Sequence, residues 1–180
     1  FGKYLFLGYV KIGSVPLSAV ISAFVLGIIC GCAASVFESS RLWTQKITRS
    51  LRLRSKLFFA GLIGLLMALM AIYIDPHSIG GGIGFAEELL FQDQTVTPSA
   101  LFVRAVGPVL SSLAGVAGGF LAPALSLGAG IGSLFANLTA SSVPHLMTLL
   151  GMAAFLAALT RAPFTSLVIV MEMTDSHAAI

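Results

Sequence analysis

One short run, Gly118–Pro123 (GGFLAP), could bind an anion without any basic side chain. Adjacent glycines followed by a proline predict a break in the backbone and then the start of a helix. The first four N–H groups of a helix have no partner within it, and the aligned peptide dipoles place about half a positive charge there. Phe120 and Leu121 would therefore hold an anion through their backbone amides. Gly118, Gly119 and Pro123 would shape the turn.

The absence of a formal charge in this run suits an ion that passes through better than an ion that stays bound. A conducting pathway needs binding weak enough to let the ion leave, and a permanent lysine or arginine would hold it tightly. Glycines can also serve helix packing alone, and that alternative accounts well for Gly128 and Gly132. It accounts poorly for Gly118-Gly119. An irregular backbone at membrane depth is tolerated only where it is buried in protein or lines a cavity.

The elements that position this run belong to an all-α integral membrane protein. Of 180 residues, 57% are hydrophobic and 9% are charged, against about 25% charged in ordinary soluble domains. No formal charge occurs in residues 12–37, 57–74 or 105–160. A membrane-spanning helix needs about 20 apolar residues, so the first two stretches suffice for one span each and the third must fold back. No polar face recurs along them, which excludes a soluble helical protein.

Basic residues mark one side of the membrane. Five of the ten, within the link Lys46–Lys56, lie between the first two apolar stretches. Cytoplasmic loops are enriched in lysine and arginine, so we expect a multi-pass protein of the cell membrane with this link in the cytoplasm. Trp43 fits an interfacial aromatic. The net charge of +3 therefore reflects topology and does not indicate nucleic-acid binding.

Proline and glycine positions divide the chain into helices. The first exceeds the apolar core of a bilayer, so it must tilt or project from it. A short helix that need not cross the membrane should precede the polar stretch of Glu87, Glu88 and Asp93, and Pro144 should end the helix that follows the glycine run. The expected elements are a long helix at about 17–48, the basic link at about 46–56, a helix at about 55–73, an outer loop at 75–84, and helices at about 98–114, 120–138, 145–159 and 162–174.

Other reactive residues indicate no chemistry. Cys30 and Cys32 lie two positions apart on a helix, so they face different sides and should act as small packing residues. No Ser/His/Asp set, metal-ligand cluster or phosphate loop occurs in the sequence. We therefore expect no enzyme activity, no metal and no cofactor.

Two runs of the sequence resemble one family. Residues 118–129, GGFLAPALSLGA, resemble the GGxFxPxLxxGA signature of the ClC chloride channel and transporter family. RAPFT at residues 161–165, followed by VMEMTD at 170–175, is similar to that family's RAPLTGxxxxxEMTD run. Their order and spacing agree with the family, as do Arg104 upstream and the glycine triplet at residues 80–82. The resemblance covers nearly the whole chain.

The resemblance implies a multi-helix ClC-type fold with broken and tilted helices, of which this chain, as a single fragment 1–180, is the second inverted-repeat half. It implies a homodimer in which each subunit has its own pathway. Amides at the positions of Phe120 and Leu121 contact the central chloride in that family. The missing N-terminal half would supply the other anion contacts and the glutamates that gate and carry protons.

The implied function is transport of chloride or a similar halide, as a voltage-gated-type channel or a chloride/proton antiporter. Two residues depart from the signature: Leu121 stands where the family has phenylalanine, and Ala117 where it often has proline. Neither removes an N–H donor, but both leave selectivity open. The alternatives are a fluoride-selective member, a transporter of organic solutes, or a non-conducting membrane scaffold.

Four further polar residues and one arginine have expected roles. Glu172 occupies the EMT position of the resemblance, and we expect it to be packed and hydrogen-bonded near a helix end. Arg104 could add positive potential to an anion path, but we expect it to extend its charged end to a membrane interface. The boundary residues of helices and loops are Asp175, His77 and His145.

Overall fold

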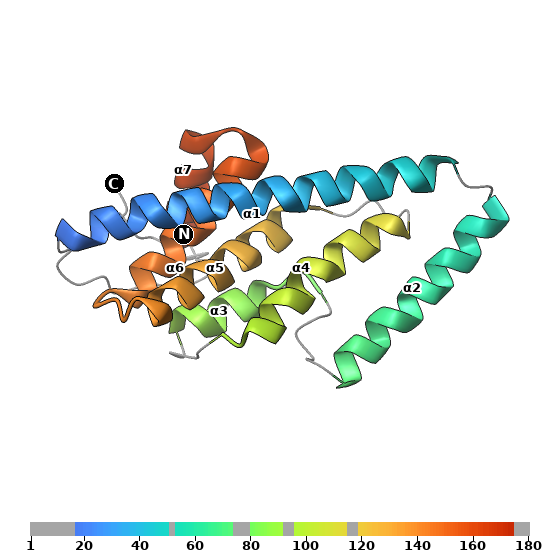
Figure 1. The fold of residues 1–180 in the computed structure, drawn as a ribbon, viewed down its shortest axis with the longest axis horizontal. Helices are drawn as coiled ribbons and strands as arrows, with labels where there is room; N and C mark the ends of the chain where they lie inside the picture. The colour runs from blue at the N-terminus through green and yellow to red at the C-terminus, as the bar shows by residue number, and fades with distance from the viewer. Residues whose placement is uncertain (1–16, 51–52, 74–79, 92–95, 115–118, 175–180) are drawn as a thin grey trace, which may run out of the picture.

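The computed structural model describes residues 17–50, 53–73, 80–91, 96–114 and 119–174, and the regular structure in these ranges is entirely helical (Figure 1). The helices are α1 (Leu17–Ser50), α2 (Leu53–Tyr73), α3 (Ile83–Phe91), α4 (Pro98–Leu113), α5 (Leu121–Leu138), α6 (Pro144–Thr160) and α7 (Pro163–Thr174). Glu87 and Glu88 lie within α3, so the prediction that they follow a short helix is wrong. The two glutamates are adjacent, and the apolar residues on either side of them, Phe85, Ala86, Leu89 and Leu90, form the buried side of this short helix.

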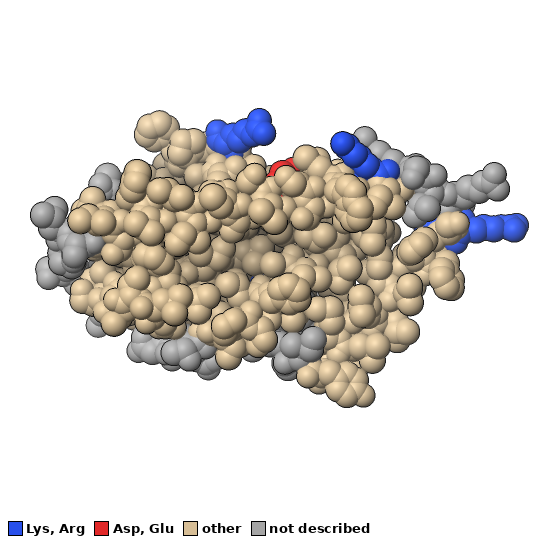
Figure 2. Space-filling view, viewed as in Figure 1, with Lys and Arg blue, Asp and Glu red and all other residues tan. Residues whose placement is uncertain are grey.

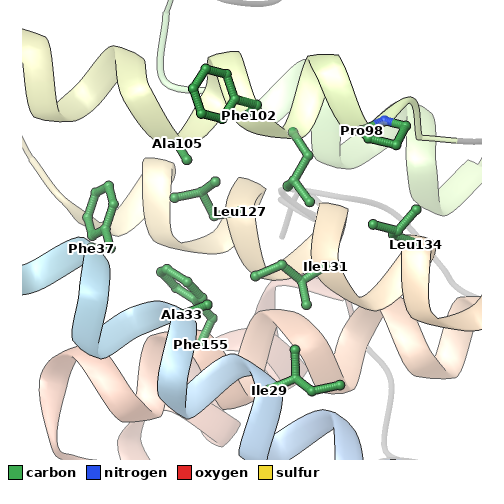
Figure 3. Close-up of a pocket in the computed structure, with 11 residues that line it drawn as sticks. Ile29, Ala33, Phe37, Pro98, Phe102, Ala105, Leu127, Ile131, Leu134 and Phe155 are labelled. Atoms are coloured by element: carbon green, nitrogen blue, oxygen red, sulfur yellow. The ribbon is translucent and has the colours of Figure 1, made fainter.

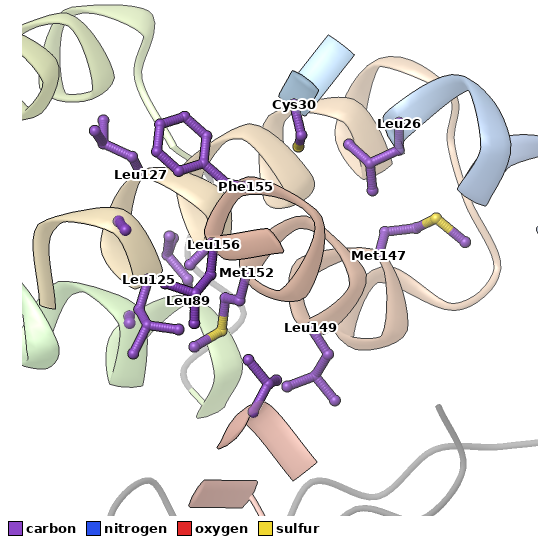
Figure 4. Packing of buried hydrophobic residues seen from close by; sticks show 14 of the residues in the cluster. Leu26, Cys30, Leu89, Leu125, Leu127, Met147, Leu149, Met152, Phe155 and Leu156 are labelled. Atoms are coloured by element: carbon purple, nitrogen blue, oxygen red, sulfur yellow. The ribbon is translucent and has the colours of Figure 1, made fainter. Parts of the chain in front are cut away.

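The core of the molecule surrounds α5. This helix makes its most extensive contact with α6, and α1 lies across α6 and α4. All residues from 124 to 130 are buried. Figure 4 shows side chains of α1, α3, α5 and α6 meeting in this core, among them Leu26, Leu89 and Met152. The other helices therefore enclose α5, the helix whose start is the predicted anion site.

Glycines bring the backbones of α5 and α6 unusually close together. A Cβ added to Gly128 would lie 2.5 Å from the carbonyl oxygen of Gly151 and 2.7 Å from the Cα of Met152. One added to Gly132 would lie 2.8 Å from the Cα of Thr148. Small residues allow such an approach between membrane helices, where packing replaces the hydrophobic effect. The sequence-based interpretation of Gly128 and Gly132 as packing residues agrees with these distances.

The turn between α5 and α6 ends one helix without glycine. Ala140 has a φ of 45°, Ser141 N–H donates to the carbonyl oxygen of Ala136 at 2.9 Å, and Ala140 N–H donates to that of Asn137 at 3.3 Å. These are the two bonds of a Schellman motif, which normally has glycine in the left-handed position. Pro144 then lies in the first turn of α6. The expectation that Pro144 ends the preceding helix is wrong, because a proline is tolerated where the helical N–H has no partner.

Within the described ranges, three helices are long and apolar enough to cross a membrane: α1, α2 and α5. At 1.5 Å per residue the 34 residues of α1 extend about 51 Å, well beyond an apolar core of about 30 Å. Figure 2 shows charged side chains along the upper edge and lysine or arginine at the end where α1 meets α2, with a broad uncharged face below them. The protein is thus an all-helical membrane protein.

Candidate functional site

The start of α5 has the backbone geometry predicted for an anion site. Phe120 is the N-cap, with φ −91° and ψ −12°, and no side chain caps it. The first intrahelical bond runs from the N–H of Ala124 to the carbonyl oxygen of Phe120, at 2.9 Å. Pro123 has no N–H and occupies the third helical position, where none is needed. Among the described residues, the N–H groups of Leu121 and Ala122 have no hydrogen-bond acceptor.

Other helices of this chain begin differently. Pro98 opens α4 and Pro144 opens α6, so each of those helices starts with a residue that has no N–H. In α5 the proline comes two positions later, and the first two helical residues keep their donors. The position of Pro123 therefore preserves the amides that an anion would need.

A cavity of about 520 Å³ opens at this helix start. Gly119, Phe120, Ala122 and Pro123 line one side of it. The remaining lining comes from α1, α2, α4 and the glycine loop: Phe37, Arg41, Gln45, Met67, Gly80, Gly81, Gly107, Pro108, Ser111 and Ser112. The structure thus gathers segments far apart in the sequence around the uncapped end of α5.

The polar groups of this cavity do not supply a free positive charge. Arg41 is bound by Glu38 through two hydrogen bonds, Nε to Oε2 at 2.8 Å and Nη2 to Oε1 at 2.7 Å. The hydroxyl of Ser112 donates to the carbonyl oxygen of Pro108 at 2.9 Å, as a helical side chain often does. The partial charge at the start of α5 is therefore an attraction for anions that carries no formal charge of its own.

The predicted site residues fall into three groups. Gly119, Phe120 and Pro123 line the cavity, and Leu121 begins the helix but is not among the lining residues. Gly118 lies outside the described residues. That the amides of Phe120 and Leu121 hold an anion stays a prediction. Ala122, which sequence reasoning passed over, lines the cavity and carries a second helical N–H; its position immediately before Pro123 was the available signal.

Arg104 does not extend to a membrane interface, and that prediction is wrong. Its side chain is 3% exposed. Nε donates to the hydroxyl of Ser126 at 3.1 Å, and Nη2 donates to the carbonyl oxygen of Gly80 at 3.1 Å. Internal acceptors on α5 and on the glycine loop replace water, so burial of the charge is compensated.

The remaining candidates lie away from the cavity. Glu172 lies near the end of α7 but is exposed, so the packed role expected for it is wrong. His145 lies in the first turn of α6, whereas His77 and Asp175 are outside the described residues. Cys30 is buried and Cys32 is exposed, as their spacing predicts. The described ranges contain no group of three or more histidine, cysteine and acidic residues that could hold a metal.

A second cavity, of about 420 Å³, differs from the first in chemistry (Figure 3). It lies among α1, α4, α5 and α6, and its lining is apolar, with Leu127, Ile131 and Phe155 among the residues drawn. Phe37 lines both cavities and packs edge-on against Phe155, with ring centroids 6.0 Å apart. Of these two cavities, both lined by described residues, the one at the start of α5 is next to backbone N–H groups that could bind an anion.

Comparisons with known proteins point in one direction. A family model described as "Voltage gated chloride channel" matches residues 1–180. The H(+)/Cl(-) exchange transporters ClcA of Salmonella paratyphi B and of Salmonella newport are each 32% identical to this chain over an alignment of 182 positions that covers 94% of it. The chain spans 38% of the length of those relatives.

A solved structure shares the fold. The crystal structure of a CLC-type fluoride/proton antiporter superimposes with a TM-score of 0.81 at 21% sequence identity. The match covers 93% of this chain and 42% of the other. The arrangement of helices described above therefore also occurs in that solved structure.

Proposed function

Because the chain belongs to the voltage gated chloride channel family, we propose that it is part of a protein that moves chloride or a similar halide across the membrane. The observation that carries the proposal is the uncapped start of α5 at the wall of a cavity. In this proposal the N–H groups of Phe120 and Leu121 contact the ion in transit. The activity is transport, and it needs neither a cofactor nor an enzymatic reaction.

Backbone donors fit an ion that must enter and leave. Hydrogen bonds to a charged group contribute about 1.5–3 kcal/mol each, so two or three amides bind a halide measurably without trapping it. The bound pair of Glu38 and Arg41 adds no net charge to the cavity wall. Weak, multi-contact binding of this kind supports conduction.

Proton coupling follows from the relatives more than from this chain. The similar ClcA proteins are named as H(+)/Cl(-) exchange transporters, which favours an antiporter over a voltage-gated-type channel. The described residues that line the cavity include no glutamate or aspartate, so the proton-carrying groups would lie elsewhere in the intact protein. In this proposal the start of α5 contacts the anion, and residues outside the lining of this cavity carry the protons.

The proposed assembly has three further parts. The chain would be the second of two inverted halves, completed by an N-terminal half of the same polypeptide, and two complete subunits would form a homodimer. The protein would lie in the cell membrane as a multi-pass protein. The basic link Lys46–Lys56 would face the cytoplasm, since lysine and arginine are retained on that side.

Flux measurements on the intact protein test the proposal. The protein is reconstituted in liposomes, and chloride and proton movements are recorded together after a chloride gradient is released. Chloride movement with stoichiometric opposing proton movement supports an antiporter, and chloride movement alone supports a channel. Fluoride movement in place of chloride would assign the fluoride-selective alternative. No movement of any halide would reject transport and leave a scaffold.

A backbone substitution tests the amide contact directly. Incorporating the α-hydroxy acid analogue of leucine at Leu121 replaces its N–H by an ester oxygen and keeps the side chain. Chloride affinity, measured by titration calorimetry, should fall about 10- to 100-fold, the loss expected for one hydrogen bond to an ion. The same ester at Leu134, which lies later in the same helix, is the control and should leave affinity nearly unchanged. Equal affinities for both esters would remove Leu121 from the site.

A further inference from the structure

A buried arginine connects three segments that meet at the start of α5. Arg104 belongs to α4, and its guanidinium donates to Gly80 of the glycine loop and to Ser126 of α5, both at 3.1 Å. Ser126 is completely buried and Arg104 almost so. A planar guanidinium presents its donors in a fixed geometry, so two such bonds hold the loop and the helix at a set distance from each other.

Ser126 extends this connection into the first turn of the helix. Its hydroxyl accepts from Arg104 Nε and donates to the carbonyl oxygen of Pro123 at 3.0 Å. A hydroxyl has one donor and two acceptor sites, so both bonds exist at once. Hydrogen bonds in a chain that begins at a charge strengthen one another. The cation therefore acts through Ser126 on the carbonyl oxygen of Pro123, in the first turn of α5, where Ala122 and Pro123 line the cavity.

The glycine loop fits this arrangement at each of its three positions. Gly82 has a φ of 82°, and a Cβ there would overlap the guanidinium of Arg104. Gly81 lies against the first turn of α5, since its Cβ would come within 3.2 Å of the Cβ of Ala122. Gly80, with a φ of 89°, supplies the carbonyl that accepts from Arg104. A side chain at Gly82 would collide with Arg104 and one at Gly81 would crowd Ala122, whereas Gly80 is favoured by its left-handed φ alone.

We propose that Arg104, Ser126 and the loop Gly80–Gly82 form a clasp that sets the orientation of the first turn of α5, and through it the affinity and selectivity for the anion. The inference rests on the proposed transport function, because it assigns these residues to the positioning of that site. Arg104, Ser126 and Gly82 are not among the residues that line the cavity, whereas Gly80 and Gly81 form part of its wall. Arg104 supplies its charge from behind the helix start, through Ser126, where it cannot trap the ion.

The variant Ser126→Ala tests the clasp in the intact protein with the smallest disturbance. It removes the acceptor for Arg104 and the donor to Pro123 at once. Chloride and fluoride affinities are measured by titration calorimetry in detergent. We expect the chloride dissociation constant to rise about three- to tenfold, the equivalent of one lost hydrogen bond, and the ratio of chloride to fluoride affinity to change. Ser126→Thr, which keeps the hydroxyl, should restore both values toward those of the wild type.

Ser133→Ala is the matched control, since Ser133 is a buried serine of the same helix nearly two turns further on. The two serine variants should have similar melting temperatures, and only Ser126→Ala should change the anion values. Unchanged affinity and selectivity in Ser126→Ala, or equal losses in Ser133→Ala and Ser126→Ala, would overturn the clasp. Wild-type protein that binds neither halide would instead reject the transport function, so the two failures are distinct.

Discussion

α5 and α2 are both long and apolar enough to cross a membrane, yet they face different surroundings. In α5, 56% of the most apolar stretch is buried within the protein, against 6% in α2. Among the described elements, the appreciable contact of α2 is with α4 alone, whereas α5 contacts α1, α3, α4 and α6. In Figure 1, α2 stands apart from the other helices. Helices of similar composition therefore differ in their surroundings, since the described residues enclose α5 and leave most of α2 exposed.

Individual glycines show how the surroundings of α5 and α2 differ. Gly128 and Gly132 of α5 meet the backbone of α6 at distances that leave no room for a Cβ. Gly61 and Gly64 of α2 have nothing within 4 Å of the place a Cβ would take. Hydropathy cannot separate these helices, because lipid and a protein interior are both apolar. The two helices differ in whether another helix packs against their glycines.

The largest expected effect comes from filling the contact between α5 and α6. Gly132→Leu would force backbone atoms of Met147 and Thr148 aside, and we expect a loss of more than about 3 kcal/mol, at the upper end for overpacking. Thermal unfolding and size-exclusion chromatography in detergent measure it. Gly64→Leu in α2 is the matched control and should change stability by less than about 0.5 kcal/mol. Similar melting temperatures for the two variants would contradict the contrast.

A smaller effect should follow from removing aromatic rings. Phe155 is 1% exposed and packs on Phe37, whereas Phe58 of α2 is 72% exposed. Phe155→Ala leaves a cavity, for which soluble cores lose about 3–5 kcal/mol. We expect about 2 kcal/mol here, because the surrounding lipid is itself apolar. Phe58→Ala should lie within about 0.5 kcal/mol of the wild type. Chemical denaturation of both variants checks the difference, and a larger loss for Phe58→Ala would reverse the assignment of the two helices.

The smallest expected effect concerns two cysteines of α1, one buried in the protein and one exposed. Cys30 of α1 is buried, with Sγ 3.8 Å from the carbonyl oxygen of Gly151, and Cys32 is exposed. N-ethylmaleimide added to the folded protein in detergent should modify Cys32 and spare Cys30, with no change in melting temperature. Mass spectrometry of the peptides measures both rates, and unfolded protein is the control in which both react. Equal rates in the folded protein would show that this face of α1 is not covered by α6.

Local sequence was most informative at the start of α5. Gly118-Gly119 and Pro123 predicted a helix from about residue 120, and the structure begins α5 at Leu121. A helix start depends on neighbouring residues only, through proline geometry and the requirement for unpaired amides. The membrane class was equally accessible, because it depends on long charge-free stretches. Both are properties that a short window of sequence contains.

The environment of Arg104 could not be predicted in this way. Its acceptors, Ser126 and Gly80, lie 22 and 24 positions away in the sequence. An isolated arginine near an apolar helix suggests an interface, because only the folded arrangement reveals internal acceptors. The glycine triplet had the same difficulty, since two of its three requirements come from Arg104 and Ala122. Residues that hydrogen-bond or pack against each other across the fold leave no pattern in the nearby sequence.

The turn after α5 shows a different reason for failure. Ala140 adopts the left-handed conformation that ends a helix, a position usually taken by glycine. With no glycine to mark the end, Pro144 was the nearest breaker, and it was assigned to the wrong side of the turn. Arg161 repeats this at the end of α6, with φ 57° and ψ 27°. The surrounding turn keeps these residues in the left-handed conformation. Residue preferences alone do not predict it, because alanine and arginine rarely adopt it.

The short helices bear on how the chain enters the bilayer during synthesis. α4, α6 and α7 have 16, 17 and 12 residues, fewer than the about 20 that cross an apolar core. A segment that enters lipid alone must already span it and satisfy its own backbone. We expect the nascent chain to be pulled strongly as α1 and α2 leave the ribosome and weakly for α6 and α7, in a force profile recorded during translation. The later helices would then enter the bilayer as a group around α5, so that insertion and folding become a single event.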